Sequence, residues 1–540
     1  MRFHWSWFSS RSINHVKRNE QLKVKVMSRT FSKSSQLYWA SGIVSICGII
    51  FEVLFGALGS YILGDGVKQY TLTISLFLTG MGIGASLSEK VVKNLITRFI
   101  AIELLIGLIG GFSSFTVFGI MAIAGEEATT IVLYTTILIV GGLTGLELPI
   151  LIRKANEIGV EMNKSTARVL FSDYAGGLVG GLLFAFYLRP EFGLVKSAFL
   201  VALVNILVAF WMIYSFRKEM VYRAAYIGIA ILLFLLMVVG TIFGEEMAFS
   251  FEQRLYKDPI IYSEETSYQK ITLTREQGDL RLFLNGQLQF SSSDEHRYHE
   301  TLVHIPMATV QNAESVLLLG GGDGLAVREL LKYDRVKSIT VVDLDPEMVK
   351  LAREHHLLTE LNEHALEDKR VQIKNEDAFQ YIKQEEKTFD VIIADLPDPN
   401  NESLNKLYTW EFYSLLRNHL EINGALMVQA TSPLFAREAY WTIDRTIAET
   451  GLITSNYHVD IPSFGNWGFV MGTREPVDQE KLKLAVKTKF LSSEMIPSLS
   501  VFGKDEDQQM MREGKKVRFE PNTLIQPHLI EKYERAWLYY

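Results

Sequence analysis

The sequence predicts a multi-pass α-helical membrane domain followed by a soluble α/β domain that begins with a small β subdomain. Three observations support this fold class. Apolar runs near the length of about 20 residues that a membrane-spanning helix needs recur between residues 38 and 245. Short alternating runs flank an Asn-Gly pair soon afterwards. From residue 315 onward, apolar strands alternate with helical segments, as in a parallel sheet.

The composition excludes several classes of protein. The chain has 540 residues, of which 48% are hydrophobic, and a formal net charge of -7. These values exclude a disordered chain and a basic nucleic-acid-binding protein. The single cysteine, Cys47, excludes an intramolecular disulfide framework and a cysteine-based zinc site. We therefore expect no metal site and no nucleic-acid partner.

The membrane domain, residues 38–245, is expected to lie in the lipid bilayer of the cell (inner) membrane. A basic segment, residues 1–37, precedes it, and its true start at Met1 or Met27 is left open. Basic residues recur in alternate loops, so the positive-inside rule places the N-terminus in the cytoplasm and, with seven spans, the C-terminal half outside. The predicted spans are Tyr38–Leu63, Tyr70–Leu87, Phe99–Ala124, Thr130–Ile152, Val169–Leu188, Ser197–Tyr214 and Ala224–Phe243.

Acidic and small residues stand out within these apolar runs. Charge at bilayer depth is costly, so buried acids face the bundle interior or mark a pathway, unless they form interhelical hydrogen bonds or lie near helix ends. The acids are Glu52, Glu103, Glu147 and Asp173. Glycines at helical spacing predict close helix packing, at Gly80/Gly84, Gly176/Gly180 and Gly177/Gly181.

The small β subdomain is predicted over residues 251–308. Alternating runs at Leu280–Leu284 and Gln287–Phe290 flank Asn285-Gly286, which predicts a hairpin. A helical stretch around Asp294–Val303 follows. Residues 309–478 form the predicted α/β domain, and residues 479–540 a C-terminal extension whose last part is helical.

The ends of successive predicted strands carry a glycine-rich turn and acids. The turn follows the strand Val316–Leu319 and allows a ligand to approach the backbone. Asp343 ends the next strand, where an acid commonly accepts hydrogen bonds from ribose hydroxyls, and Asp377 follows the third. This arrangement favours a nucleoside site, although acids at strand ends also cap helices. The glycines of the turn are Gly320, Gly321, Gly322 and Gly324.

Three further acids indicate a cationic ligand. Asp323 lies inside the glycine turn, where a carboxylate suits a ligand that ends in an ammonium group rather than in an amino acid. Asp395 and Asp398 flank Leu-Pro after the fourth strand, where they can hold an amine and accept its proton. An ordinary Asx-Pro turn is the alternative explanation for the last pair.

These motifs resemble the spermidine synthase, or polyamine aminopropyltransferase, family. The resemblance covers about Tyr268 to Gly472, and the membrane half resembles the multi-pass segment fused to this enzyme in some bacteria. It implies a Rossmann-like fold of the class I methyltransferase type. The matching segments are Tyr268-Gln269, Asn285–Gln289, Asp294-Glu295, Tyr298–Glu300, Gly320–Gly324, Asp343–Asp345, Asp377-Ala378, Asp395–Pro399 and Gln429.

The resemblance implies a role for each matching residue. Asp395 corresponds to the acid that deprotonates or orients the attacking amine, and Asp323 to the acid that holds the aminopropyl ammonium. Asp343 corresponds to the ribose-binding acid and Asp377 to the residue that reads adenine. Residues 396–406 would form a gate over the site. Further substrate contacts are implied for Gln269, Gln289, Tyr298, His299 and Asp398.

The implied reaction transfers an aminopropyl group from decarboxylated S-adenosylmethionine, as co-substrate and without a cofactor, to an amine such as putrescine. The products are spermidine and 5′-methylthioadenosine. Soluble members commonly form dimers or tetramers, which implies a homo-oligomer. Two departures affect the amine half of the site. Leu396-Pro397 replaces a Ser-Ser/Thr pair, and Phe464 lies near the position of a family tyrosine, so that one hydroxyl is missing.

Two alternatives and one conflict remain at this stage. A membrane sensor or transporter could bind a nucleoside or polyamine without turnover, and a methyltransferase could use S-adenosylmethionine itself, although Asp323 disfavours the latter. The substrates of an aminopropyltransferase are made in the cytosol. This places the catalytic domain in the cytoplasm, whereas the charge pattern places it outside.

Overall fold

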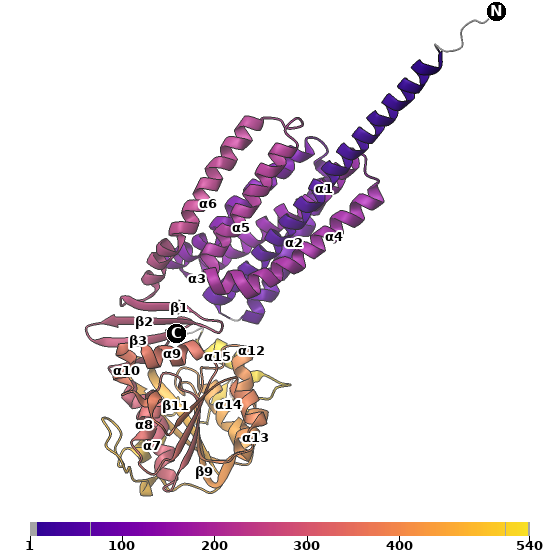
Figure 1. Ribbon diagram of the computed structural model, residues 1–540. Helices are drawn as coiled ribbons and strands as arrows, with labels where there is room; N and C mark the ends of the chain where they lie inside the picture. The colour runs from indigo at the N-terminus through magenta and orange to yellow at the C-terminus, as the bar shows by residue number, and fades with distance from the viewer. Residues whose placement is uncertain (1–7, 65, 513–514, 538–540) are drawn as a thin grey trace, which may run out of the picture. The chain divides into compact units, whose positions relative to one another are not determined.

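The computed structural model describes residues 8–64, 66–512 and 515–537, and the side chains of residues 8–32 lie outside this description. Most basic residues of the predicted N-terminal segment therefore lie outside the described side chains. The chain divides into two compact units, Met1–Lys257 and Asp258–Tyr540 (Figure 1).

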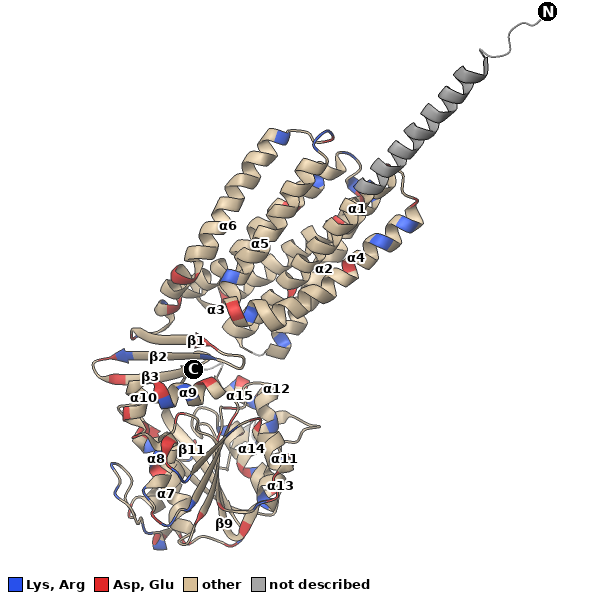
Figure 2. Ribbon diagram, viewed as in Figure 1, with Lys and Arg blue, Asp and Glu red and all other residues tan. Residues whose placement is uncertain are grey.

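The first unit is a bundle of long apolar helices. Five helical segments are long and apolar enough to cross a membrane. Figure 2 shows that Lys, Arg, Asp and Glu are sparse along them. The elements are α1 (Phe8–Leu63), α2 (Gly66–Leu87), α3 (Leu95–Glu157), α4 (Met162–Leu183), the π-helical turn η2 (Phe184–Leu188), α5 (Arg189–Ser215) and α6 (Arg223–Glu252).

Two of the five segments contain a reversal of the chain. A straight α3 would be about 95 Å long at 1.5 Å per residue, roughly three times the hydrocarbon thickness. Gly125, with φ of 79°, and Gly193, with φ of 60°, interrupt the helical geometry. Thr129 Oγ1 lies 3.7 Å from Met121 Sδ, eight residues earlier, which requires the chain to turn back between them. Likewise, the Ser197 hydroxyl donates to the Leu188 carbonyl at 3.0 Å. Each of the seven predicted spans therefore lies on a separate helical piece, with a turn of the chain between successive pieces, and Val169–Leu188 runs from α4 into η2.

Two of the three predicted glycine pairs pack helices closely, whereas a Cβ at Gly177 or Gly181 would meet only side chains, with Ile49 nearest at 3.3 and 4.0 Å. A Cβ at Gly84 would lie 2.0 Å from the Gly142 carbonyl oxygen, and one at Gly80 would lie 2.6 Å from that of Leu138. A Cβ at Gly176 would lie 2.3 Å from the Gly42 carbonyl oxygen. Only a residue without a side chain permits these backbone contacts.

Two of the four acids in the apolar runs face the bundle interior. Glu103 and Glu147 are 0% and 5% exposed, and their carboxyl groups face each other across the two antiparallel halves of α3. Glu52 and Asp173 are partly exposed. At one end of the bundle, Glu219 forms ion pairs with Lys33 at 2.6 Å and with Lys154 at 2.7 Å.

The second unit begins with a four-stranded antiparallel sheet in the order β1-β2-β3-β4. The predicted hairpin is confirmed. Asn285 and Gly286 have φ values of 51° and 80°, the positive values that a tight two-residue turn requires. Sequence reasoning missed the first strand. The strands are β1 (Ile260–Glu265), β2 (Lys270–Glu276), β3 (Asp279–Leu284) and β4 (Gln287–Ser291).

A seven-stranded sheet forms the centre of the unit, in the order β10-β11-β9-β8-β5-β6-β7. Strands β5 to β9 pair in parallel, as a parallel sheet requires, and β11 runs antiparallel to both of its neighbours, β9 and β10. Strand order reverses between β5 and β8. The strands are β5 (Ser315–Gly320), β6 (Ser338–Asp343), β7 (Val371–Asn375), β8 (Phe389–Asp395), β9 (Leu420–Gln429), β10 (Ile453–Ile461) and β11 (Gly465–Thr473).

Helices cover both faces of this sheet because its buried strands are apolar on both sides. Leu318 and Val391 point into one core, whereas Leu319 and Ile392 point into the other. The predicted boundary at residue 308 placed the first helix with the β subdomain, but α7 packs against β9 and β10. The main helices are α7 (Glu295–Thr309), α8 (Leu325–Leu331), α9 (Pro346–Glu354), α10 (His356–Leu361), α11 (Ala378–Gln384), α12 (Glu402–Asn405), α13 (Trp410–Asn418), α14 (Arg437–Ala448) and α15 (His528–Trp537).

Candidate active site

The glycine turn and the fourth strand end meet where strand order reverses. Gly320 is the register partner of Asp395 in the parallel pair of β5 and β8. A Cβ on Gly320 would lie 1.9 Å from the Asp395 carbonyl oxygen, and its φ is 83°, so only glycine fits there. Ligands of open α/β sheets bind at such a reversal, outside the carboxyl ends of the strands.

Asp343, at the end of β6, lies beside the glycine turn. Its carboxylate accepts the Gly322 N–H at 3.0 Å and the Asp345 N–H at 2.9 Å. Burial raises the pKa of Asp343 to about 6, although these N–H donors oppose the shift. Gln269 reaches this region from the β subdomain, since its Nε2 donates to Asp345 Oδ2 at 3.0 Å. This bond connects the β subdomain to the segment after β6 that carries Asp343 and Asp345.

Asp377 caps a helix, which is the alternative role that the sequence indicated for an acid at a strand end. Its Oδ1 accepts the Gln380 N–H at 3.0 Å at the start of α11. Its Oδ2 forms an ion pair with Lys406 Nζ at 2.6 Å. Lys406 ends the segment of residues 396–406, so this ion pair ties that segment to the end of β7.

A short hydrogen bond joins two of the predicted site residues, Tyr298 and Asp395. The Tyr298 hydroxyl, on α7, donates to Asp395 Oδ1 at 2.5 Å. Burial raises the pKa of Asp395 to about 6, while the charge of His299 opposes this shift and that of Asp323 adds to it. Asp323 accepts the Leu325 N–H at 2.8 Å, and burial raises its pKa as well. The site therefore contains carboxyl groups poised to exchange protons near neutral pH.

His299 is held as a cation beneath these acids. Its Nδ1 lies 2.8 Å from Glu295 Oε2, one helical turn earlier on α7. Burial lowers the pKa of His299, but the hydrogen bond and charge of Glu295 outweigh burial and raise it to about 9. Arg328 Nη2 contacts both Glu295 oxygens, at 3.0 and 2.9 Å. Glu295 thus shares its charge between two cations.

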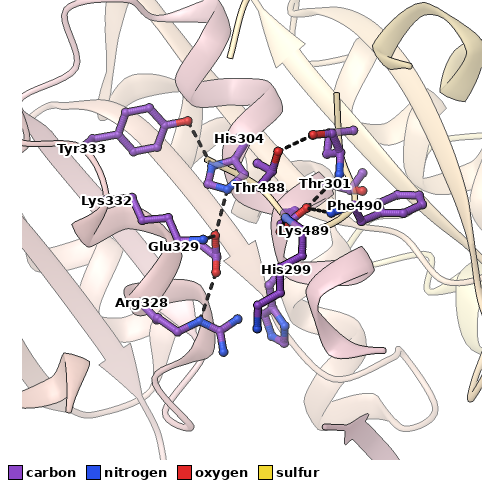
Figure 3. Close-up of polar contacts among 12 residues, drawn as sticks. His299, Thr301, His304, Arg328, Glu329, Lys332, Tyr333, Thr488, Lys489 and Phe490 are labelled. Carbon is purple, nitrogen blue, oxygen red and sulfur yellow. Dashed lines mark hydrogen bonds and ion pairs between the residues drawn. The ribbon is translucent and has the colours of Figure 1, made fainter. Parts of the chain in front are cut away.

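Arg328 extends this arrangement into a buried charge network (Figure 3). Its Nε donates to Glu329 Oε1 at 3.0 Å, and Lys332 Nζ lies 2.5 Å from Glu329 Oε2. His304 Nε2 lies 2.8 Å from the same oxygen. Burial raises the pKa of Glu329, but His304, Lys332 and Arg328 together hold it below its ordinary value. Sequence reasoning missed this network, because its members show no motif spacing.

Asp398 lies in a separate hydrogen-bonded cluster. Gln429 Nε2 donates to its Oδ1 at 3.1 Å, and the Thr431 hydroxyl donates to its Oδ2 at 3.1 Å. Gln429 Nε2 also lies 2.6 Å from the buried Tyr408 hydroxyl. Thr431 has a φ of 59°, a conformation rare for a β-branched residue and typical of functional sites. Sequence reasoning named neither Tyr408 nor Thr431.

Gln289 is not drawn into the hydrogen-bonded clusters above. Its Nε2 donates to the Gln287 carbonyl at 3.1 Å on its own strand. Among the side chains that the structure describes, those of residues 33–64, 66–511 and 515–537, no group of three or more His, Cys, Asp or Glu is arranged to hold a metal ion.

Fold and site together define a Rossmann-like α/β domain with an acidic site at the reversal of its sheet. A family profile described as the spermine/spermidine synthase domain matches residues 295–481. A polyamine aminopropyltransferase from Oceanobacillus iheyensis is 62% identical over 94% of this chain and 99% of its own length. One from Leptospira interrogans is 40% identical over 93% of this chain and 98% of its own length. The chain belongs to the polyamine aminopropyltransferase family, which confirms the resemblance.

Among solved structures, spermidine synthase from Thermotoga maritima matches 45% of this chain and 84% of its own, with 27% identity and a TM-score of 0.42. Family membership along nearly the whole chain favours an enzyme over the binding-only sensor or transporter. It also favours aminopropyl transfer over methyl transfer.

Proposed function

We propose that this protein transfers the aminopropyl group of decarboxylated S-adenosylmethionine to an amine such as putrescine, with spermidine and 5′-methylthioadenosine as products. One observation carries the proposal: Asp323, Asp395 and Asp398 are collected at one sheet edge, and among the described residues none of them forms an ion pair with Lys or Arg. Such carboxylates suit a substrate pair rich in positive charge.

The reaction is a direct displacement. The amine nitrogen forms a bond to the propyl carbon beside the sulfonium, the carbon–sulfur bond breaks, and its electron pair remains on the thioether of methylthioadenosine. The new ammonium loses a proton to Asp395. Because the sulfonium is its own leaving group, the protein chiefly holds two substrates in line and keeps the attacking nitrogen unprotonated.

The nucleoside is assigned to the glycine turn and its neighbours. The turn of Gly320, Gly321, Gly322 and Gly324 carries the nucleoside, and Asp343, which accepts the Gly322 N–H, receives the ribose hydroxyls. Gln269 supports that edge through Asp345. Asp377 is assigned to the adenine end, where its contact with Lys406 links nucleoside binding to the gate segment. Gln289 would have to leave its contact with Gln287 to reach a substrate.

The amine is assigned to the other side of Asp395. Tyr298 holds the Asp395 carboxylate in one orientation through its hydroxyl. Asp323 receives the terminal ammonium of the aminopropyl group, and His299, fixed by Glu295, sets the charge between the two acids. Asp398 receives the acceptor amine.

The direct test uses purified full-length protein in detergent with decarboxylated S-adenosylmethionine and a panel of putrescine, cadaverine, agmatine and spermidine. Mass spectrometry follows methylthioadenosine and the new polyamine. We expect both products in equal amounts, and only when an acceptor is present. Methylthioadenosine without polyamine, or no turnover with any amine, would contradict the proposal.

The pH dependence of kcat/KM follows from the raised pKa of Asp395. The base must be ionised, and its pKa in the free enzyme is about 6, so activity should fall as pH drops below about 6. The Tyr298→Phe variant lacks the hydrogen bond that favours the ionised form, so its acidic limb should move to higher pH. Rate profiles from pH 4 to 9 check this. A limb near pH 4 in the wild type, or the same limb in both proteins, would argue against Asp395 as the base.

We place the protein in the cell membrane with its catalytic domain in the cytoplasm, where its substrates are made. The basic loop at Lys218 and the reversal at Glu126 lie at opposite ends of the bundle, since Gly119, near that reversal, contacts Phe251 at the far end of α6. A membrane-impermeant maleimide should therefore label Lys218→Cys in intact cells, and Glu126→Cys and Lys504→Cys only after lysis. Cys47 is buried and gives a low background. The reverse labelling would place the catalytic domain outside, as the positive-inside rule expects.

A further inference from the structure

A tyrosine from the far C-terminus enters the cluster around Asp398. Tyr533, on α15, donates its hydroxyl to Asp398 Oδ2 at 2.9 Å and is 8% exposed. Thr431 donates to the same oxygen, and Gln429 donates to the other. The family profile ends at residue 481, more than 50 residues before this tyrosine. The side chain therefore comes from outside the segment that carries the recognised motifs.

All three groups that contact Asp398 are neutral donors. They orient a carboxylate and solvate it, but they leave its negative charge without a protein counterion among the described residues. A carboxylate prepared in this way is suited to a cation that arrives with the substrate, because charge-assisted hydrogen bonds are the stronger ones. On the turn between β10 and β11, the aromatic side chain is Phe464, which has no hydroxyl. Tyr533 therefore supplies a phenol hydroxyl to Asp398, whereas Phe464 on the β10–β11 turn has none to supply.

The position of α15 is determined by its contacts with α14 and with Phe435, which precedes that helix. Arg535 Nη2 forms an ion pair with Glu438 Oε2 at 2.6 Å, and Lys532 Nζ donates to the Thr442 hydroxyl at 2.9 Å. Trp537 packs on Phe435, with ring centroids 5.8 Å apart. These contacts flank Tyr533 on its helix, so the phenol is placed by a built interface and not by a loose end of the chain.

The same extension is also bonded to the segment that carries Asp398. Asn522 is fully buried, and its Nδ2 donates to Asn405 Oδ1 and to the Tyr408 carbonyl, both at 3.0 Å. Its own carbonyl accepts the Trp410 N–H at 2.8 Å. Figure 1 shows α15 beside α12, and α12 forms the last part of the gate segment. The C-terminal extension and residues 396–410 thus form one hydrogen-bonded structure.

We propose that Tyr533 is a positioning residue for the acceptor amine and that the C-terminal extension completes the acceptor subsite by fixing Asp398. This inference rests on the proposed function and adds to it the source of acceptor recognition. Tyr533 bonds Oδ2 of Asp398 and contacts neither the glycine turn nor Asp343, so its loss changes how a diamine binds and leaves decarboxylated S-adenosylmethionine binding intact.

The test compares Tyr533→Phe with the wild-type full-length protein in detergent. Loss of one hydrogen bond to a carboxylate is worth about a tenfold change in affinity, so KM for putrescine should rise about tenfold. KM for decarboxylated S-adenosylmethionine should stay within about twofold, because nothing in the glycine turn changes. Tyr381→Phe is the matched control: it removes a phenol bonded to Glu385 on α11, outside the site, and should change neither KM.

A second variant tests the role of α15 without removing the Tyr533 hydroxyl. Arg535→Met removes the ion pair with Glu438, loosens α15 and should raise KM for putrescine in the same direction as Tyr533→Phe. An unchanged KM for putrescine in Tyr533→Phe, or an equal rise for both substrates, would overturn the inference while the proposed function stands. Absence of turnover in the wild type with every amine would overturn the function itself, and the inference with it.

Discussion

Replacement of Asp395 by asparagine should lower kcat about 100- to 10,000-fold, the range expected for removal of a general base. Asparagine keeps the size of the side chain and can still accept the Tyr298 hydroxyl, so the fold and both binding subsites should persist. The carboxamide cannot take the proton that the attacking nitrogen must lose. KM values should change far less than kcat. Product formation by mass spectrometry, with equal substrate concentrations for both proteins, measures the effect.

The matched control is Asp390→Asn, a replacement on the same strand. Asp390 lies at the opposite end of β8, where its Oδ2 accepts the N–H groups of Glu314 and Ser315 at 2.9 Å. An asparagine oxygen can accept both bonds, and no substrate reaches that edge. A comparable loss of kcat in Asp390→Asn would show that strand integrity, rather than the base, is being measured. Wild-type kcat in Asp395→Asn would exclude Asp395 as the proton acceptor.

Replacement of Arg328 by methionine should be the most destabilising of these changes, by about 3–5 kcal/mol. Arg328 is buried and contacts both Glu295 and Glu329. Removing one partner of a buried ion pair leaves uncompensated charge in the interior, and methionine fills most of the volume without replacing the donors. The apparent Tm in detergent should therefore fall by on the order of 10 °C for a domain of this size.

Arg445→Met on α14 is the control for the loss of an ion pair as such. Arg445 and Glu449 are about half exposed, and their pair lies 2.5 Å apart. Solvent-exposed pairs four residues apart on a helix contribute about 0.3–0.5 kcal/mol, so its apparent Tm should barely change. Equal falls of the apparent Tm in the two variants would show that the network around Glu329 stabilises the fold no more than an exposed ion pair does. A stable Arg328→Met protein would show the same.

Local sequence signals predicted the elements of the site well. The Asn285-Gly286 turn, the glycine turn after β5 and the acids at strand ends each depend on a few neighbouring residues. Their backbone requirements are visible without the fold. The positive φ values of Gly286 and Gly320 are examples. The seven apolar runs were equally visible, since length and composition decide whether a helix can span a bilayer.

Contacts between distant segments could not be predicted in this way. The capping of α11 by Asp377 is local, but its ion pair with Lys406 joins residues 29 apart. Arg328 and Glu295 lie 33 residues apart, and no spacing rule connects them. Tyr533 and Asp398 lie 135 residues apart. Each pair exists only because strands and helices bring the two segments to the same edge of the sheet.

The sequence by itself determined the two-part organisation, the sheet strands from β5 to β8, the acids at the strand ends and the family. These features depend on periodicity, composition and short motifs. The tertiary structure alone decided which carboxylates lack an ion pair with Lys or Arg, which carboxylate holds His299 in place, and that a C-terminal tyrosine reaches Asp398. The physical reason is that charge balance and hydrogen bonding depend on distance in space, which burial in a common core sets and which chain order does not reveal.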